Sequence, residues 1–240
     1  MVSPFDLDGQ VALVIGAAPG GLGARAASAL ADHGATVVTA DLADAERTVD
    51  VTDESSVADL VAGVVAEHGR LDVVVNAAGV MLRKAYDETS VEEFEHVVRV
   101  NLTGTWIVAR EAGRVMAAQG HGRIVNLTTV YAERVGPVPE SAYYASKAGV
   151  VNVTRALAAE LGPRGVTVNC LAPGVFYPTK MTAALGAAPE RLEWFANRTM
   201  LGRLGDPDRD FAGPLLLLAS PASSYVTGQV LYVDGGWSAW

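Results

Sequence analysis

A short apolar run that leads through glycines into a helical segment constrains the fold more than any other feature of the chain. The run is Val11–Ile15, the glycine-rich turn is Gly-Ala-Ala-Pro-Gly-Gly-Leu-Gly, and helical composition follows over residues 24–33. Such a run is typical of a strand buried on both faces of a parallel sheet. A strand, a glycine turn and a helix N-terminus together form a cradle whose free N–H groups bind a pyrophosphate. We therefore expect a dinucleotide to contact Gly16, Gly20, Gly21, Leu22 and Gly23. A tight turn without a ligand is the alternative interpretation.

Similar apolar runs recur along the whole chain, and helical segments lie between most of them. The runs are 36–40, 48–51, 71–75, 122–129, 167–171 and 229–233. Strands that alternate with helices predict one doubly wound α/β domain over residues 1–240. Residues 175–206 are irregular and rich in aromatic residues, and a long segment of this kind in a compact domain is usually functional. We expect it to be a substrate-binding loop or flap within the domain.

Composition excludes several classes of function. The 240 residues carry a net charge of −9 and contain no run of Lys or Arg, which argues against nucleic acid or an anionic membrane as a partner. The one cysteine, Cys170, lies in an apolar run, and so no disulfide framework is expected. No long apolar stretch or signal sequence is present, so the expected location is cytoplasmic. The four histidines have no metal-ligand spacing, and no metal site is predicted.

Two further strand ends carry signals for a dinucleotide. The second strand ends in Asp41, where a carboxylate accepts hydrogen bonds from ribose hydroxyls and repels a 2′-phosphate. This favours NAD(H) over NADP(H). The fourth strand ends in Asn76-Ala77-Ala78-Gly79, and these small residues leave room for a ligand at the switch point of the sheet.

The segment from Tyr143 to about Leu161 has helical composition and carries the residues we expect to perform the chemistry. Tyr143 and Lys147 are four residues apart, so on a helix they lie on one face. A neighbouring ammonium lowers the pKa of a phenol, which suits a group that exchanges a proton with an alcohol or ketone oxygen. A solvated Tyr-Lys pair on a helix surface is the alternative. Asn101, a buried amide that needs partners in an apolar helix, is a further candidate.

These features occur in an order that resembles the short-chain dehydrogenase/reductase family over essentially the whole chain. The matching motifs are the Gly16–Gly23 turn, Asp50-Val51, Asn76-Ala77-Ala78-Gly79, Asn101, Tyr143-x-x-x-Lys147, Pro173-Gly174 and Val233-Asp234-Gly235-Gly236. The resemblance implies a single Rossmann-type domain with a seven-stranded parallel sheet and helices on both faces. It also implies hydride transfer between a nicotinamide cofactor and a secondary alcohol or ketone.

The resemblance further implies a role for each matching residue. Tyr143 is the expected acid/base, Lys147 binds the nicotinamide ribose and lowers the Tyr143 pKa, and Asn101 holds a proton-relaying water. Thr129 stands where the family has a serine that orients the substrate oxygen. The expected cofactor contacts are Asp50 and Val51 on the adenine, Asn76, Ala77, Ala78 and Gly79 beside the nicotinamide, and Pro173, Gly174 and Thr179 on its carboxamide. A homotetramer is the expected assembly, in which residues 102–116 and 150–161 pair across subunits.

The chain departs from the family pattern at three places, and the first two keep a second hypothesis open, although the intact Tyr143, Lys147 and Asn101 set argues against it. The glycine turn is one residue longer than usual and contains Pro19, Thr129 replaces the serine, and Thr179 lies five rather than four positions after Gly174. A catalytically silent dinucleotide sensor or scaffold of the same fold is therefore the alternative to an enzyme. The sequence leaves the substrate open among those of sugar-acid dehydrogenases, 3-oxoacyl reductases and secondary alcohol dehydrogenases.

Overall fold

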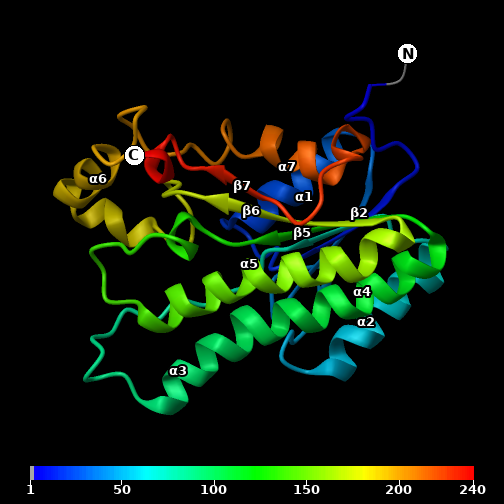
Figure 1. Cartoon of the computed structure of the whole chain (residues 1–240), viewed down its shortest axis with the longest axis horizontal. Coiled ribbons are helices and arrows are strands. Elements are labelled where there is room, and N and C mark those ends of the chain that lie inside the picture. Colours follow the sequence, from blue (N-terminus) through cyan, green and yellow to red (C-terminus); the bar gives the residue numbers. More distant parts are fainter. Residues whose placement is uncertain (1–2) are drawn as a thin grey trace.

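A parallel seven-stranded sheet forms the centre of the molecule, which we describe from a computed structural model over residues 3–240 (Figure 1). Its strand order is β3-β2-β1-β4-β5-β6-β7, so the order reverses between β1 and β4. The strands are β1 (Val11–Ile15), β2 (Thr36–Asp41), β3 (Arg47–Thr48), β4 (Val73–Asn76), β5 (Gly122–Leu127), β6 (Val166–Pro173) and β7 (Val230–Val233). This confirms the predicted doubly wound α/β fold in one domain.

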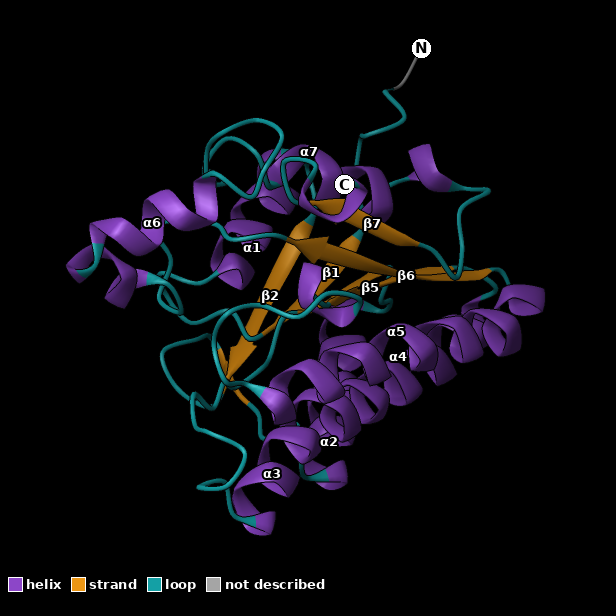
Figure 2. Ribbon diagram, turned by 60° about the vertical axis from the view of Figure 1, so that its left-hand side comes forward, coloured by secondary structure: helices purple, strands orange, loops and turns teal. Residues whose placement is uncertain are grey.

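Helices cover both faces of the sheet, as predicted (Figures 1 and 2). One layer contains α2 (Glu54–His68), α4 (Thr105–Gln119) and α5 (Ser141–Leu161), which pack on one face with α3 (Val91–Val98) at its end. The other layer contains α1 (Leu22–Asp32) and α7 (Ala212–Ala219). The sheet is therefore buried on both sides, which is why its strands read as continuous apolar runs.

Two helices, α2 and α3, begin at residues whose side chains accept backbone N–H bonds. Asp53 caps α2 by accepting from the N–H groups of Ser55 and Ser56. Ser90 and Glu93 form a reciprocal capping box at the start of α3. These caps satisfy donors that a helix N-terminus otherwise leaves without partners. Along the part of the chain that the structure describes, no helix combines the length and the apolar character that crossing a bilayer requires.

The structure differs from the sequence-based prediction at three element boundaries. The strand expected over residues 48–51 is only Arg47–Thr48, because β3 is an edge strand that pairs with two residues of β2. The strand expected over 122–129 ends at Leu127, so Thr128 and Thr129 lie beyond the sheet. The helix expected through Asn101 is interrupted by a π-helical turn, Arg99–Gly104.

The segment 175–206, which we call the flap segment, stands apart from the two layers (Figure 2). It contains a 3₁₀ turn, Ala183–Ala187, and the helix α6 (Pro189–Ala196). Phe195 packs with Val130 and Trp237 in a small apolar cluster separate from the two main cores. The flap segment is therefore held mainly by side-chain contacts rather than by strand pairing.

Candidate active site

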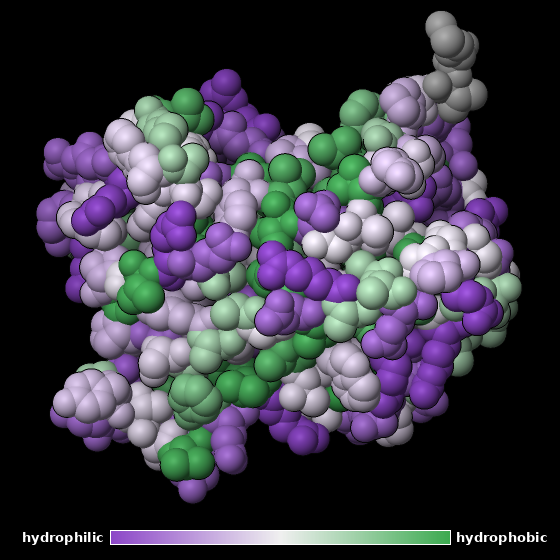
Figure 3. Space-filling view, in the orientation of Figure 1, coloured by the Kyte–Doolittle hydropathy of each residue, from purple (hydrophilic) through white to green (hydrophobic). Residues whose placement is uncertain are grey.

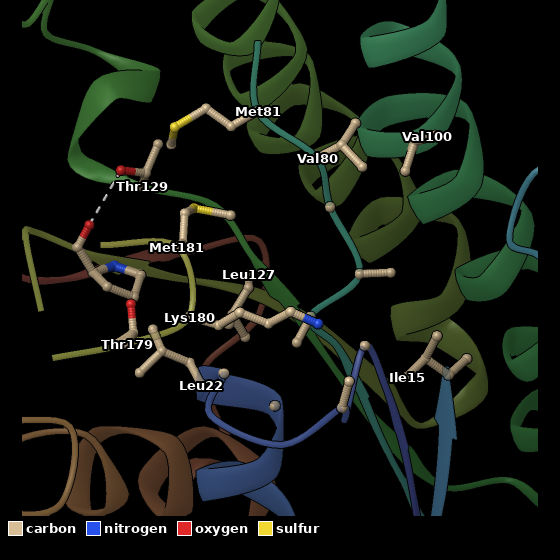
Figure 4. Close-up of a pocket in the computed structure, with 18 of the residues that line it drawn as sticks. Ile15, Leu22, Val80, Met81, Val100, Leu127, Thr129, Thr179, Lys180 and Met181 are labelled. Carbon is tan, nitrogen blue, oxygen red and sulfur yellow. Dashed lines mark hydrogen bonds between the residues drawn. The ribbon is translucent and has the colours of Figure 1, made fainter. Parts of the chain in front are cut away.

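A cavity of about 640 Å³ lies over the carboxyl ends of the strands, between the glycine turn and the flap segment (Figure 4). Ile15 at the end of β1 pairs with Asn76 at the end of β4, so the cavity opens where the strand order reverses. Ligands of open α/β sheets bind at this point. The cavity is therefore the candidate site, and the positions of the predicted residues are described relative to it.

One wall of the cavity, which we call the glycine wall, is formed by the small residues that follow β1 and β4. Their backbones pack directly against each other. A Cβ on Gly16, which has a φ of +81°, would collide with the backbone of Ala78, and a Cβ on Gly23 would collide with the carbonyl oxygen of Gly16. No side chain caps the N-terminus of α1 at Gly21. The first-turn N–H groups of α1 are thus left facing the cavity, in the arrangement that binds phosphate groups.

Asp41 holds the extended glycine turn against the end of β2. Its Oδ2 accepts from the N–H of Ala18 at 2.9 Å, and its Oδ1 accepts from the N–H of Leu42 at 2.7 Å. Asp41 also lines the cavity. The carboxylate therefore fixes the turn through hydrogen bonds and places a negative charge in the cavity next to the glycine turn.

Tyr143 and Lys147 lie at the other end of the cavity, both about 5% exposed, on the first turns of α5. The Lys147 Nζ lies 5.9 Å from the centroid of the Tyr143 ring and donates a hydrogen bond to the Leu127 carbonyl at 2.9 Å. The helical spacing therefore brings the two side chains together, as predicted.

The electrostatics of this pair differ from the prediction. Burial raises the pKa of the Tyr143 phenol, with a smaller contribution from Glu140, so the expected lowering by Lys147 is not found here. Burial also lowers the pKa of Lys147 to about 8. The physical reason is that both side chains are buried, and the loss of water disfavours the charged form of each. The phenol is therefore protonated at neutral pH.

Asn101 links the loop after β4 to α5, the helix that carries Tyr143 and Lys147, through hydrogen bonds. Its Oδ1 accepts from the N–H of Val80 at 2.8 Å, and its Nδ2 donates to the Val80 carbonyl at 2.9 Å and to Ser146 Oγ at 3.0 Å. Ser146 Oγ in turn donates to the Tyr143 carbonyl at 2.8 Å. The π-helical turn directs this amide inward, and turns of this kind are frequent at functional sites. The buried amide thus has the partners that the sequence required.

Thr129 follows β5 and lines the cavity, as Tyr143 does, and Figure 4 shows its hydroxyl on the cavity wall. Its Oγ1 donates to the Pro173 carbonyl at 3.3 Å and accepts from the N–H of Tyr131 at 3.4 Å. Both hydrogen bonds are long, and the hydroxyl proton can rotate toward another acceptor. The side chain is 7% exposed, so its orientation is restricted by packing.

Most of the predicted site residues line the cavity, but four do not. Those that line it are Gly16, Gly21, Leu22, Gly23, Asp41, Val51, Ala77, Ala78, Gly79, Thr129, Tyr143, Lys147, Pro173, Gly174 and Thr179. The Asn76 amide instead donates to the Thr105 carbonyl of α4, and Asp50 is exposed and accepts from Thr52. Gly20 faces Lys180 outside the lining, and Asn101 lies behind Gly79.

Several residues that the sequence did not single out also line the cavity. Lys180, Met181 and Thr182 come from the flap segment, and Met81 and Arg83 come from the loop after β4. Arg83 donates through Nε to Glu140 Oε1 at 2.8 Å. Lys180, Met181 and Thr182 fall within residues 175–206, the predicted substrate-binding segment, so the sequence indicated their segment but not their individual positions.

The lining fits a dinucleotide of the nicotinamide type. The glycine wall, the uncapped N-terminus of α1 and the Asp41 carboxylate match a pyrophosphate and a ribose at one end. The buried Tyr143 and Lys147 offer a phenol and an amine at the other end. Over residues 3–240, His, Cys, Asp and Glu form no cluster able to hold a metal ion.

Comparison with known proteins agrees with this geometry. The sequence profile of a family described as Enoyl-(Acyl carrier protein) reductase matches residues 16–238. The chain belongs to the short-chain dehydrogenase/reductase family. It is thus a member of a family of NAD(P)-dependent oxidoreductases, as the resemblance of its motifs implied.

Short-chain dehydrogenases with different substrates are similar to the chain over nearly its whole length. It is 39% identical to the (2S)-[(R)-hydroxy(phenyl)methyl]succinyl-CoA dehydrogenase subunit of Thauera aromatica, over 96% of this chain and 97% of that one. It is 36% identical to the gluconate 5-dehydrogenase of Gluconobacter oxydans, over 97% and 96% of the two chains.

A solved structure shows the same likeness. The gluconate 5-dehydrogenase of Burkholderia cenocepacia, in complex with NADP and tartrate, is similar with a TM-score of 0.92 and 33% identity, over 99% of this chain and 98% of that one. That relative binds NADP, and the comparisons establish NAD(P) as the cofactor of the family. The preference of this chain for NAD or NADP depends on its own residues.

Proposed function

We propose that this protein transfers a hydride between NAD(H) and a secondary alcohol or ketone. One observation carries the proposal: Tyr143, Lys147 and Thr129 line the same cavity as Gly16, Gly21 and Gly23 of the glycine turn. The nicotinamide cofactor, when bound, supplies or accepts the hydride. The protein groups around it bind the substrate oxygen and handle the proton.

The proposed proton donor in the reductive direction is the Tyr143 phenol. Because burial raises its pKa, the phenol carries its proton at neutral pH, as a general acid must. Thr129 Oγ1, which is held only by long hydrogen bonds, donates a second hydrogen bond to the same carbonyl oxygen. In oxidation the phenol must first release its own proton, for which we propose the relay through Lys147 and Asn101, and the resulting phenolate then accepts the alcohol proton.

Lys147 and Asn101 position this proton donor. Lys147 approaches Tyr143 from one turn along α5, and its amine faces Gly79, where an added Cβ would lie 3.5 Å from Nζ. This supports binding of the nicotinamide ribose by Lys147. Asn101 holds the loop at Val80 against Ser146 of α5, which supports a positioning role and a relay of protons toward Lys147.

Asp41 supports NAD(H) as the preferred dinucleotide. A carboxylate that is fixed by two backbone N–H groups cannot easily turn away from a 2′-phosphate, and like charges at close range repel. Kinetics with NADH and NADPH in parallel test this choice. The proposal requires a larger kcat/KM for NADH, and Asp41→Ala is expected to narrow the difference. A higher kcat/KM for NADPH in the wild type would reverse the assignment of the cofactor.

Replacing Tyr143 with Phe tests the proposed chemistry. Loss of the phenol is expected to lower kcat by about 10³-fold, within the range for general acid–base catalysis, while the affinity for NADH stays within about twofold. Tyr144→Phe is the matched control, because the Tyr144 hydroxyl donates to the Val138 carbonyl and its side chain does not line the cavity.

Two results of this experiment would contradict the proposal. A Tyr143→Phe variant that turns over ketones at the wild-type rate would exclude the phenol as proton donor. A wild-type protein that binds NADH but reduces no member of a broad carbonyl panel would favour the dinucleotide sensor instead.

We also propose that α4 and α5 form the contact between subunits of a homotetramer. Figure 3 shows hydrophobic residues gathered in a band over these two helices. The α5 surface offers small side chains, among them the exposed Ala148 and Ala156, and Trp106 of α4 is 38% exposed. Exposed apolar surface of this kind is typical of interfaces. Light scattering of the purified protein gives the mass that tests it, and a monomer would exclude the proposal.

A further inference from the structure

Lys180 is attached to the glycine turn although it belongs to the flap segment. Its backbone N–H donates to the Gly20 carbonyl at 2.8 Å. The two residues also pack closely, since a Cβ on Gly20 would lie 3.7 Å from the Lys180 Cβ. The Lys180 side chain therefore starts directly above the turn whose N–H groups face the cavity.

The side chain of Lys180 extends into the cavity. Figure 4 shows it running across the space between the glycine turn and the loop after β4, with its ammonium group pointing inward. Leu22 of the first turn of α1 lies on the same side of the cavity as Lys180. The ammonium is thus directed toward the region that the N-terminus of α1 also faces.

Three cationic side chains line the cavity, and they differ in their partners. Arg83 is paired with Glu140, and Lys147 donates to the Leu127 carbonyl. Within residues 3–240 the Lys180 ammonium makes neither a hydrogen bond nor an ion pair. A cation that points into a cavity and has no acidic partner is suited to an anionic ligand.

We infer that Lys180 binds the diphosphate of the dinucleotide from the flap side, opposite the N–H groups of the glycine turn. This inference rests on the dinucleotide site of the proposed function and adds a residue to it. The diphosphate carries two negative charges, and the glycine wall supplies backbone dipoles but no cationic side chain. Lys180 supplies that charge and joins the flap segment to the bound ligand.

Binding of ADP-ribose tests this inference without any turnover. ADP-ribose contains the diphosphate but no nicotinamide, and calorimetry gives its Kd directly. We expect Lys180→Met to weaken ADP-ribose binding by about tenfold, because a charge-assisted contact is lost. Lys180→Arg is expected to keep the affinity within about threefold. Arg191→Met is the charge-matched control, since Arg191 is an exposed flap residue outside the cavity lining.

The dependence on ionic strength and a comparison of NADH with NADPH give two further tests of this inference. The affinity of the wild type for ADP-ribose is expected to fall with ionic strength more steeply than that of Lys180→Met. NADH and NADPH are expected to lose affinity by the same factor in Lys180→Met, because both contain the diphosphate.

Two outcomes would overturn the inference. Equal affinities of Lys180→Met and Arg191→Met for ADP-ribose would show that Lys180 does not bind the diphosphate. A loss confined to NADPH would assign Lys180 to the 2′-phosphate instead. Failure of the proposed function looks different, since it appears as a wild-type protein that binds ADP-ribose without catalysing any reduction.

Discussion

The two walls of the cavity are built on different physical principles. The glycine wall consists of residues that follow β1 and β4, and the strands fix it through residue-by-residue pairing. The flap wall is held by a few separate contacts. These include the parallel bridge between Phe176 and Gly205, the hydrogen bond from Lys180 to Gly20, and the bond from Thr182 Oγ1 to the Phe176 carbonyl at 2.7 Å.

This difference explains why the residues of the glycine wall were easier to predict from the sequence than those of the flap wall. A wall set by sheet geometry needs glycines and small residues at fixed places, because a side chain there would collide with backbone. A wall held by a few scattered hydrogen bonds and by side-chain packing accepts many sequences. Relatives of similar fold that differ in substrate are consistent with such a division.

Filling the glycine wall is expected to have the largest effect on cofactor binding. Gly23→Val would place a Cβ against the Gly16 carbonyl, so we expect the Kd for NADH to rise at least 100-fold, or about 2.7 kcal/mol. Gly213→Ala is the control, because its added Cβ would meet no atom within 4 Å. Fluorescence titration with NADH measures the effect, and circular dichroism confirms folding. A folded Gly23→Val protein with normal affinity would contradict the close packing of this wall.

A smaller effect is expected at Thr129, which lies between the two walls. Thr129→Val keeps the shape but removes the hydroxyl, and we expect kcat to fall about 100-fold, as for loss of one donor to a developing oxyanion. Thr129→Ser keeps the hydroxyl, and its kcat is expected to stay within about threefold. Steady-state kinetics on one ketone measure both. Equal rates for the Val and Ser variants would remove Thr129 from the chemistry.

The pH profile is expected to show the state of Lys147. Its pKa is lowered to about 8, so the ammonium is charged below that pH and loses its charge above it. We expect kcat/KM for NADH in ketone reduction to be level below about pH 7 and to fall about tenfold per pH unit well above pH 8. The Tyr143 phenol, whose pKa is raised, stays protonated throughout this range. A level profile up to pH 10 would exclude Lys147 as the titrating group.

The smallest effect is expected at the base of the flap segment, where Arg203 pairs with Asp210. Hydrogen bonding to Arg203 holds the pKa of Asp210 at about 2. Since the pKa of Asp210 in the folded protein lies below its ordinary value of 3.8, the pair stabilises the fold above about pH 4, and this contribution is lost as the pH falls toward 2.

Arg203 is half exposed, so solvent screening keeps the contribution of the pair to stability small. Arg203→Gln is expected to raise the ketone KM about threefold at pH 7 and to change the melting temperature by only a few degrees. Kinetics and calorimetry at pH 7 measure both. A change in KM for NADH as large as that for the ketone would show that the two walls are not independent.

The fold was predictable because its signals are local. Each buried parallel strand is a continuous apolar run in the sequence. Gly16 and Asp41 stand at the ends of two of these strands, and Tyr143 stands in the first turn of a helix. The Tyr143 and Lys147 pair followed from helix geometry alone. The spacing of these residues was therefore enough to predict which strand or helix carries each of them.

Contacts between distant segments decided the rest. The sequence did not indicate that Asn76 would bond to Thr105 instead of facing the cavity, that a π-helical turn would direct Asn101 inward, or that Lys180 would lie over Gly20. Nor did it give the sign of the Tyr143 pKa shift, because burial depends on everything that packs around the ring. Periodicity and spacing determine secondary structure and strand ends, whereas desolvation and contacts across the fold exist only once the tertiary structure has formed.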